Sequence, residues 1–229
     1  MSGGSFVSPA TRERVRGWAV PIATALGRLG LTPNALTVIG FIGTCGAAVA
    51  AAAQAWALAG ALVLVFGIFD LFDGALARAT GRASKFGAFL DSTLDRTGES
   101  LVLVGVAVGC ALADYVFVPG VALAGLAATF ASGVTYTRAK AESLGVHGEV
   151  GVAPRPERLA ILAIGLVLAG LAGGVSISSP SGGVELFSIA ERPGGATLLG
   201  IALGLIAILS AVTIVQRIVH VRNQLKNEQ

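Results

Sequence analysis

The sequence predicts an all-α integral membrane protein with six transmembrane helices. Hydrophobic residues make up 54% of the 229 residues and charged residues only 13%, whereas a soluble domain carries about 25% charged residues. No charged residue occurs between Leu29 and Phe69, and a helix needs roughly 20 apolar residues to cross a bilayer. This stretch is therefore long enough for two spans.

The other four spans are predicted from the positions of the charged residues. The first two helices are expected to meet near Gln54, and the third to begin among the acidic residues that precede Ser100. Further uncharged runs mark the rest of the bundle: 100–113, 115–137, 159–184 and 193–216. We expect a single membrane domain over residues 1–229, with the six spans within 31–221.

The N-terminal segment, residues 1–30, is predicted to form a juxtamembrane helix. Val15 to Leu29 mixes apolar residues with arginines and includes Trp18, a pattern typical of an amphipathic helix that lies in the membrane interface. No short apolar block with a cleavage site follows the polar start of the chain, so a signal peptide is not expected.

The distribution of basic residues predicts the orientation in the membrane. With the N-terminus inside, the inner segments and adjoining helix ends hold every Lys and Arg except Arg192. This asymmetry places both termini and the functional site on the cytoplasmic side of the cell membrane. The net charge of +3 thus reflects topology rather than nucleic-acid binding.

Four aspartates carry the strongest functional signal, because each charge at the centre of a span costs about 2.5–3.5 kcal/mol. Asp70 and Asp73 are three residues apart and Asp91 and Asp95 four apart, so each pair shares a helix face. Gly81 lies between the pairs, where the chain can turn and bring them together. Such carboxylates repel unless cations lie between them, which predicts a Mg²⁺ or Mn²⁺ site for phosphoryl transfer. An ion pathway or pairing with nearby arginines is the alternative.

This segment resembles the motif of the CDP-alcohol phosphotransferase family, D-x2-D-G-x2-A-R-x8-G-x3-D-x3-D. All eight fixed residues are present: Asp70, Asp73, Gly74, Ala77, Arg78, Gly87, Asp91 and Asp95. The resemblance implies a six-span enzyme in which the first three aspartates bind two divalent metals. It also implies that Asp95 is both a metal ligand and the general base.

The same resemblance implies a reaction and a nucleotide site. The acceptor hydroxyl loses its proton to Asp95 and attacks the phosphorus bonded to the lipid of CDP-diacylglycerol, and CMP leaves. Six residues are implied to contact the CDP-lipid: Asn34, Thr37, Gly74, Arg78, Ser84 and Gly87. For Asn34 and Thr37, helix capping beside Pro33 is an alternative explanation.

A second polar block, between the fourth and fifth spans, bears on the acceptor. Its cations suit a phosphorylated substrate, although the positive-inside rule also requires basic residues there. Two short motifs in this block are similar to those of phosphatidylinositol phosphate synthases, which use inositol 1-phosphate. They are Arg-x-Lys-x-Glu at 138–142 and Arg-Pro-Glu-Arg at 155–158. The resemblance implies four residues that bind the acceptor's phosphate: Arg138, Lys140, Arg155 and Arg217. The order Arg-x-Lys departs from the Lys-x-Arg expected of those enzymes, and the two side chains are not interchangeable.

Three other functions remain open from the sequence. Glycerol 3-phosphate or another alcohol phosphate is the nearest alternative acceptor for the same chemistry. An Asp-rich membrane prenyltransferase typically has two widely separated acidic motifs, whereas this chain has one compact block. A transporter with carboxylates on its pathway leaves the fixed glycines unexplained. We also expect a homodimer from the family, which the Gly- and Ala-rich spans permit.

Overall fold

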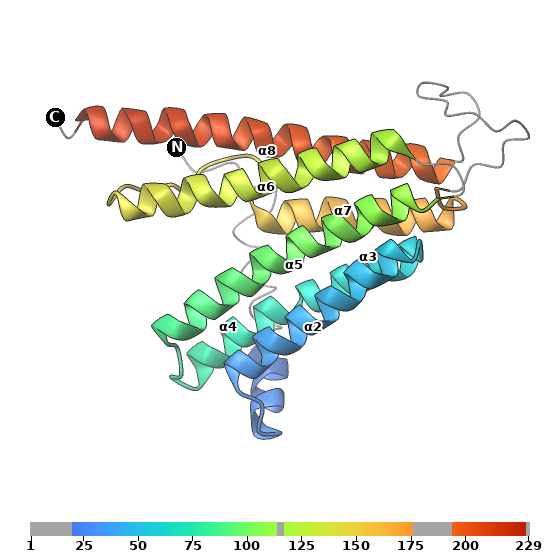
Figure 1. Ribbon diagram of the computed structural model, residues 1–229. Coiled ribbons are helices and arrows are strands. Elements are labelled where there is room, and N and C mark those ends of the chain that lie inside the picture. Colours follow the sequence, from blue (N-terminus) through green and yellow to red (C-terminus); the bar gives the residue numbers. More distant parts are fainter. Residues whose placement is uncertain (1–19, 114–116, 176–193, 228–229) are drawn as a thin grey trace, which may run out of the picture.

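The computed structural model describes residues 20–113, 117–175 and 194–227, and this part of the chain contains helices and no strand (Figure 1). The helices are α2 (Pro33–Ala52), α3 (Trp56–Gly67), α4 (Phe69–Ala79), α5 (Lys85–Ala111), α6 (Val118–Ser143), α7 (Arg155–Leu171) and α8 (Gly194–Asn227). Residues 20–28 form a further helical segment ahead of α2. The all-α prediction is confirmed.

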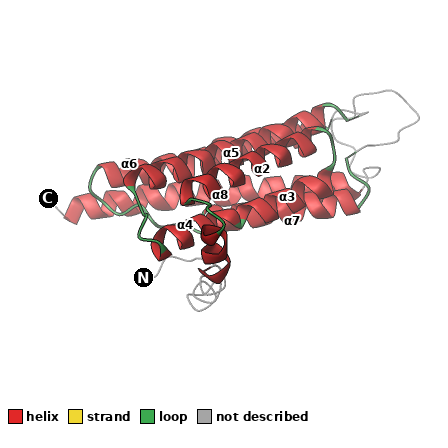
Figure 2. Cartoon of the chain, turned by 90° about the horizontal axis from the view of Figure 1, so that it is seen from below, coloured by secondary structure: helices red, strands yellow, loops and turns green. Residues whose placement is uncertain are grey.

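The long helices are arranged in two layers of three (Figure 2). One layer contains α2, α5 and α6, with α5 in the middle, and the other contains α3, α7 and α8, with α7 in the middle. At the edges of the layers α2 contacts α3 and α6 contacts α8. The middle helices α5 and α7 therefore face each other across the interior, and α4 continues α3 along α2.

Turns between the helices lie where the sequence predicts them. Gln54, between α2 and α3, has a positive φ of 61°, and Gly81, between α4 and α5, has a φ of 64°. A reversal at Gly81 is sterically easy because glycine has no Cβ. Ser84 then caps α5, since its hydroxyl accepts a hydrogen bond from the Gly87 N–H at 2.9 Å. The turn brings the two aspartate-bearing helices together.

Four helical segments are long and apolar enough to cross a membrane: Pro33–Ala52, Trp56–Ala79, Val118–Ser143 and Gly194–Lys226. They confirm an integral membrane protein. The other two long helices differ from them: α5 has 27 residues but carries the acidic cluster, and α7 has only 17 residues. The count of six spans therefore stays a prediction.

The N-terminal segment is described only from residue 20. Over residues 20–28 it is helical, and its buried Ala23 packs with Leu36 of α2 and with Ala75 and Leu76 of α4. Trp18 and the earlier arginines lie outside the described residues. The location of this helix in the membrane interface stays a prediction.

Small residues allow the backbones of neighbouring helices to approach closely. A Cβ added to Gly105 of α5 would clash with the carbonyl oxygen of Ala48 on α2. A Cβ on Gly60 of α3 would lie 2.6 Å from the carbonyl oxygen of Ala163 on α7. Close backbone approach is how helices associate in lipid, where no hydrophobic force drives them together.

Gly105→Ala is expected to lower the melting temperature of the detergent-solubilised protein, because α5 must move away from α2. Overpacking of this kind typically costs about 1–3 kcal/mol. Gly204→Ala in α8 is the matched control, since nothing lies within 4 Å of a Cβ at that position. Equal melting temperatures for the two variants would show that the close approach at Gly105 is unimportant.

Candidate active site

The acidic group is formed by α4 and α5, which carry two aspartates each. One oxygen from each of Asp70, Asp91 and Asp95 lies within 4.8 Å of the others. Oxygens that share a divalent cation, each about 2.0–2.6 Å from it, have separations in this range. The structure therefore brings three of the four predicted ligands into one group.

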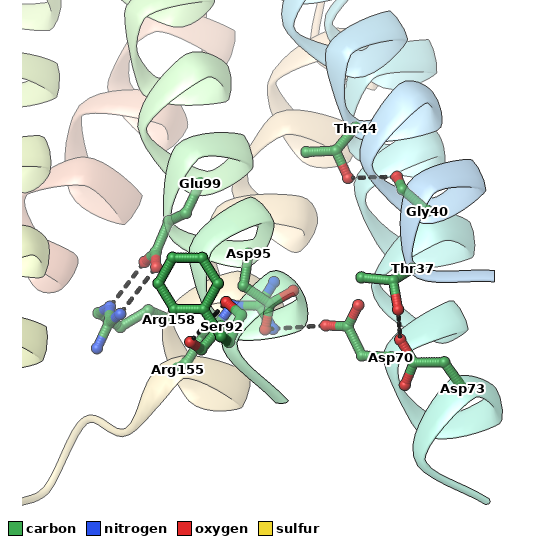
Figure 3. Close-up of polar contacts among 11 residues, drawn as sticks. Thr37, Gly40, Thr44, Asp70, Asp73, Ser92, Asp95, Glu99, Arg155 and Arg158 are labelled. Carbon is green, nitrogen blue, oxygen red and sulfur yellow. Dashed lines mark hydrogen bonds and ion pairs between the residues drawn. The ribbon is translucent and has the colours of Figure 1, made fainter. Parts of the chain in front are cut away.

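Asp73 lies beside this group and has a different partner. Its side chain is only 5% exposed, and its Oδ2 accepts a hydrogen bond from the Thr37 hydroxyl of α2 at 2.6 Å (Figure 3). The contact ties α4 to α2 and sets the orientation of the carboxylate. A metal-ligand role for Asp73 stays a prediction.

A cation from α7 lies between two of the carboxylates. Nη1 of Arg155, the first residue of α7, donates to Oδ2 of both Asp70 and Asp95 at 2.5 Å (Figure 3). One positive charge offsets part of the repulsion among three carboxylates. The group thus keeps a formal net charge of about −2, from three acids and one guanidinium.

This arrangement fits a divalent metal cofactor, predicted as Mg²⁺ with Mn²⁺ as the alternative. Asp91 Oδ1 is buried and has no hydrogen-bond partner among the described residues. Such an oxygen is costly to leave unsatisfied, and a hard cation is the natural partner of a carboxylate. Asp70, Asp91 and Asp95 are the residues that would hold the metal.

A cleft of about 200 Å³ opens next to the acids, between α2, α4 and the start of α5. It is lined by all six residues predicted to contact the nucleotide: Asn34, Thr37, Gly74, Arg78, Ser84 and Gly87. Asp73 and Asp91 also line it, so the cleft is continuous with the acidic group. These residues belong to α2, α4, α5 and the Ser84 cap of α5, and only the fold brings them together.

Two details of the cleft concern predictions from the sequence. Thr32 is the residue that caps α2, with its hydroxyl accepting from the Ala35 N–H at 3.2 Å, so the capping explanation for Asn34 and Thr37 is wrong. A Cβ on Gly87 would lie 3.1 Å from both Asn34 Oδ1 and Ser84 Oγ. The missing side chain keeps this part of the cleft open.

The four residues predicted to bind the acceptor's phosphate are not gathered in one place. The Arg155 guanidinium donates hydrogen bonds to Asp70 and Asp95. Arg138 is paired with Glu142 at 2.8 Å and with Glu149 at 3.3 Å. Lys140 is exposed and lines a groove between α6 and α8, together with Arg217.

Arg217 of α8 is 5% exposed and helps to hold the loop between α6 and α7, residues 144–154. Its Nε donates to the Val150 carbonyl at 2.8 Å, and its Nη1 donates to the Val134 carbonyl. Thr213, one turn earlier on α8, accepts from the Ala153 N–H at 3.1 Å. In this structure the Arg217 guanidinium therefore stabilises backbone carbonyls, and its role in acceptor binding stays a prediction.

Sequence reasoning missed a buried ion pair next to the site. Glu99 of α5 accepts from Nε and Nη2 of Arg158 on α7 at 2.8 and 2.9 Å (Figure 3). The two side chains are 7% and 2% exposed. Glu99 follows Asp95 by four residues and Arg158 follows Arg155 by three, so each lies on the same helix face as its neighbour in the site. This helical spacing is the sequence feature that could have predicted the pair.

The Arg155→Gln variant is expected to bind Mn²⁺ at least about tenfold more tightly than the parent protein does. The variant lacks the cation that competes for Asp70 and Asp95, and unit charges about 4 Å apart interact by several kcal/mol near a protein surface. Electron paramagnetic resonance of free Mn²⁺ measures the dissociation constant.

Arg138→Gln is the control for this measurement, because Arg138 pairs with glutamates outside the acidic group. Its Mn²⁺ affinity should equal that of the parent. Unchanged or weaker Mn²⁺ binding by Arg155→Gln would contradict the competition.

Several known proteins are similar to this chain over almost its whole length. It is 38% identical over 215 residues to the phosphatidylinositol phosphate synthase of Cutibacterium acnes, covering 90% of this chain and 94% of that protein. It is 34% identical over 217 residues to the archaetidylinositol phosphate synthase of Pyrococcus horikoshii, covering 94% and 96%.

The fold is also similar to that of solved structures. The phosphatidylinositol phosphate synthase of Mycobacterium tuberculosis in complex with manganese and citrate has a TM-score of 0.73 and 29% sequence identity, covering 89% of this chain and 88% of that one. The same enzyme with CDP-DAG bound has a TM-score of 0.72 at 29% identity, covering 89% and 92%.

The family comparison agrees with the motif and the geometry. The model of the CDP-alcohol phosphatidyltransferase family matches residues 30–206, which include both aspartate pairs and the cleft. The prenyltransferase and transporter alternatives are therefore rejected. The four aspartates, the cleft beside them and this match identify the chain as a member of the CDP-alcohol phosphatidyltransferase family.

Proposed function

We propose that this membrane enzyme transfers the phosphatidyl group of CDP-diacylglycerol to a hydroxyl of inositol 1-phosphate, giving phosphatidylinositol phosphate and CMP. The observation that carries the proposal is the group of Asp70, Asp91 and Asp95 at one end of the predicted nucleotide cleft. Support for the substrates comes from the relatives, which are named for inositol phosphate lipids, and from the solved relative with CDP-DAG bound.

The cleft between α2, α4 and α5 is the proposed site of the cytidine diphosphate. Arg78 and Arg82 line it, and guanidinium groups form strong paired hydrogen bonds with phosphate oxygens. Gly74 and Gly87 leave room for a nucleotide to approach the backbone. The diphosphate would then extend from the cleft toward Asp91.

The aspartates have two proposed tasks. All four, Asp70, Asp73, Asp91 and Asp95, are proposed ligands of two divalent ions, and such ions supply charge neutralisation and stabilisation of the transferring phosphoryl group. Asp95 is also the proposed general base. It accepts the proton of the acceptor hydroxyl as the oxygen bonds to the lipid phosphorus and the bond from that phosphorus to CMP breaks.

Arg155 connects the base to the acceptor. Its guanidinium donates to Asp95 at 2.5 Å, which orients the carboxylate and leaves positive charge at the place where a phosphorylated acceptor arrives. We propose that Arg155 binds the phosphate of the acceptor, with Arg138, Lys140 and Arg217 as further contributors. The same pocket chemistry would accept glycerol 3-phosphate, which is the second candidate acceptor.

The assembly and the orientation in the membrane are also part of the proposal. The inner ends of α6 and α8 carry the basic residues Lys140, Arg222 and Lys226, as the positive-inside rule requires. We propose six spans, both termini and the active site in the cytoplasm, and one domain over residues 1–229. A homodimer is proposed from the family resemblance.

The substrate assignment predicts that CMP is released from radiolabelled CDP-diacylglycerol only when Mg²⁺ or Mn²⁺ and inositol 1-phosphate are both present. Thin-layer chromatography identifies the lipid product, and chelation of the metal should stop the reaction. Parallel reactions contain glycerol 3-phosphate and free inositol. Formation of product with glycerol 3-phosphate and not with inositol 1-phosphate would overturn the assignment.

Asp95→Asn is expected to lower kcat by about 10²–10⁴-fold, the usual contribution of a general base. Binding of CDP-diacylglycerol should be largely retained, because the cleft residues are untouched. Thr97→Val is the control, since Thr97 is exposed on α5 and its hydroxyl bonds only to the Thr93 carbonyl among the contacts described. Full activity of Asp95→Asn would remove Asp95 from the role of base.

A further inference from the structure

Two polar bridges join the middle helices of the two layers. The first is the contact of Arg155 on α7 with Asp95 on α5, and the second is the pair of Arg158 with Glu99, about one helical turn farther along both helices (Figure 3). Elsewhere α5 packs on α2 and α6, and α7 packs on α3 and α8. At the active site the two bridges therefore provide the direct polar connection between α7 and α5.

The second bridge has the geometry of a positional constraint. Arg158 donates Nε to one carboxylate oxygen of Glu99 at 2.8 Å and Nη2 to the other at 2.9 Å. Such a two-point contact defines the orientation of both planar groups. A buried ion pair contributes little net stability compared with apolar side chains of similar size, so stability alone does not account for it.

Arg158 also positions the chain that leads to Arg155. Its Nη1 donates to the Ala153 carbonyl at 3.0 Å, and the Ala153 N–H donates to Thr213 of α8 at 3.1 Å. Ala153 is fully buried. The residue two positions before Arg155 is thus held from both sides, and the start of α7 has little freedom to shift.

We propose that Glu99 and Arg158 are positioning residues, which set α7 against α5 so that the Arg155 guanidinium is held on Asp70 and Asp95. The inference rests on the proposed function, in which Arg155 binds the acceptor's phosphate beside the base. Glu99 and Arg158 act through Arg155 and do not touch the substrates.

The geometry separates the two substrates in their dependence on this pair. The residues that line the nucleotide cleft all come from positions 33–91, which precede Glu99 and do not include α7. Loss of the pair is therefore expected to displace the acceptor relative to Asp95 and to leave the lining of the nucleotide cleft intact.

The test is the double variant Glu99→Leu with Arg158→Met, which removes both charges and retains apolar volume. It should fold, because no charge is left buried without a partner. We expect kcat/KM for inositol 1-phosphate to fall on the order of 10²-fold, the usual effect of a small misplacement in an active site. KM for CDP-diacylglycerol should stay within about twofold of the parent value. A folded double variant with parental kcat/KM for the acceptor would overturn the proposal.

Leu103→Ala with Leu162→Ala is the matched control. These leucines lie one turn beyond Glu99 and Arg158 on the same two helices, and both are 1% exposed in the shared core. The control should lower the melting temperature and leave KM for the acceptor unchanged. If both double variants lose acceptor efficiency in proportion to their loss of stability, the ion pair is only a packing element and the proposal is wrong.

Mn²⁺ binding gives a readout that does not depend on turnover. With Arg155 no longer held on the aspartates, the double variant should bind Mn²⁺ more tightly, as Arg155→Gln does. An unchanged dissociation constant would contradict the positioning role. Failure of the proposed function has a different signature, since the parent protein would then release no CMP with inositol 1-phosphate while the shift in Mn²⁺ affinity is still measured.

The Arg158→Lys variant tests the same positioning role if the double variant does not fold. Lysine retains the positive charge but cannot make the two-point contact. We expect the same selective loss of acceptor efficiency and the same direction of change in Mn²⁺ affinity. Parental values for both quantities would overturn the proposal.

Discussion

Carboxylates of like charge lie within 4.8 Å of one another inside a bundle whose neighbouring surfaces are apolar. Their mutual repulsion and the loss of water around them oppose folding. Arg155 of α7 offsets part of this cost, and a bound divalent cofactor would offset more of it. The arrangement of the helices around the site follows from this requirement, because α7 must bring its guanidinium to α4 and α5.

Several polar contacts between helices lie at or beside the acidic group. Asp73 is bonded to Thr37, Arg155 to Asp70 and Asp95, and Arg158 to Glu99. Farther along the bundle the interior consists of apolar and small side chains that permit close backbone approach. Close apolar packing joins the helices there, and directional polar contacts orient the groups that react.

The loop between α6 and α7 connects this site with α8. Side chains from α8 hold its backbone at Val150 and Ala153, and the loop ends where α7 begins with Arg155. Arg217 therefore has a structural task that is separate from any contact with an acceptor. A basic residue near an active site can serve the backbone of the protein, and its charge alone does not assign it to a substrate.

Local properties of the sequence were sufficient to predict much of the fold. Uncharged runs located the apolar helices, Gln54 and Gly81 marked the turns, and the spacing of the four aspartates identified the reaction class through the family motif. All of these depend on residues close together in the chain, where helical periodicity and turn chemistry apply directly.

The tertiary structure alone decided which charged groups meet. Periodicity shows which residues share a face of one helix, but it does not show which helix that face contacts. Hence the pairing of Asp73 with Thr37, the position of Arg155 on the aspartates and the buried pair of Glu99 with Arg158 were not predicted. The sequence by itself determined the reaction class through the family motif, and the packing of α7 on α3 and α8 decided that the Arg155 guanidinium meets the aspartates.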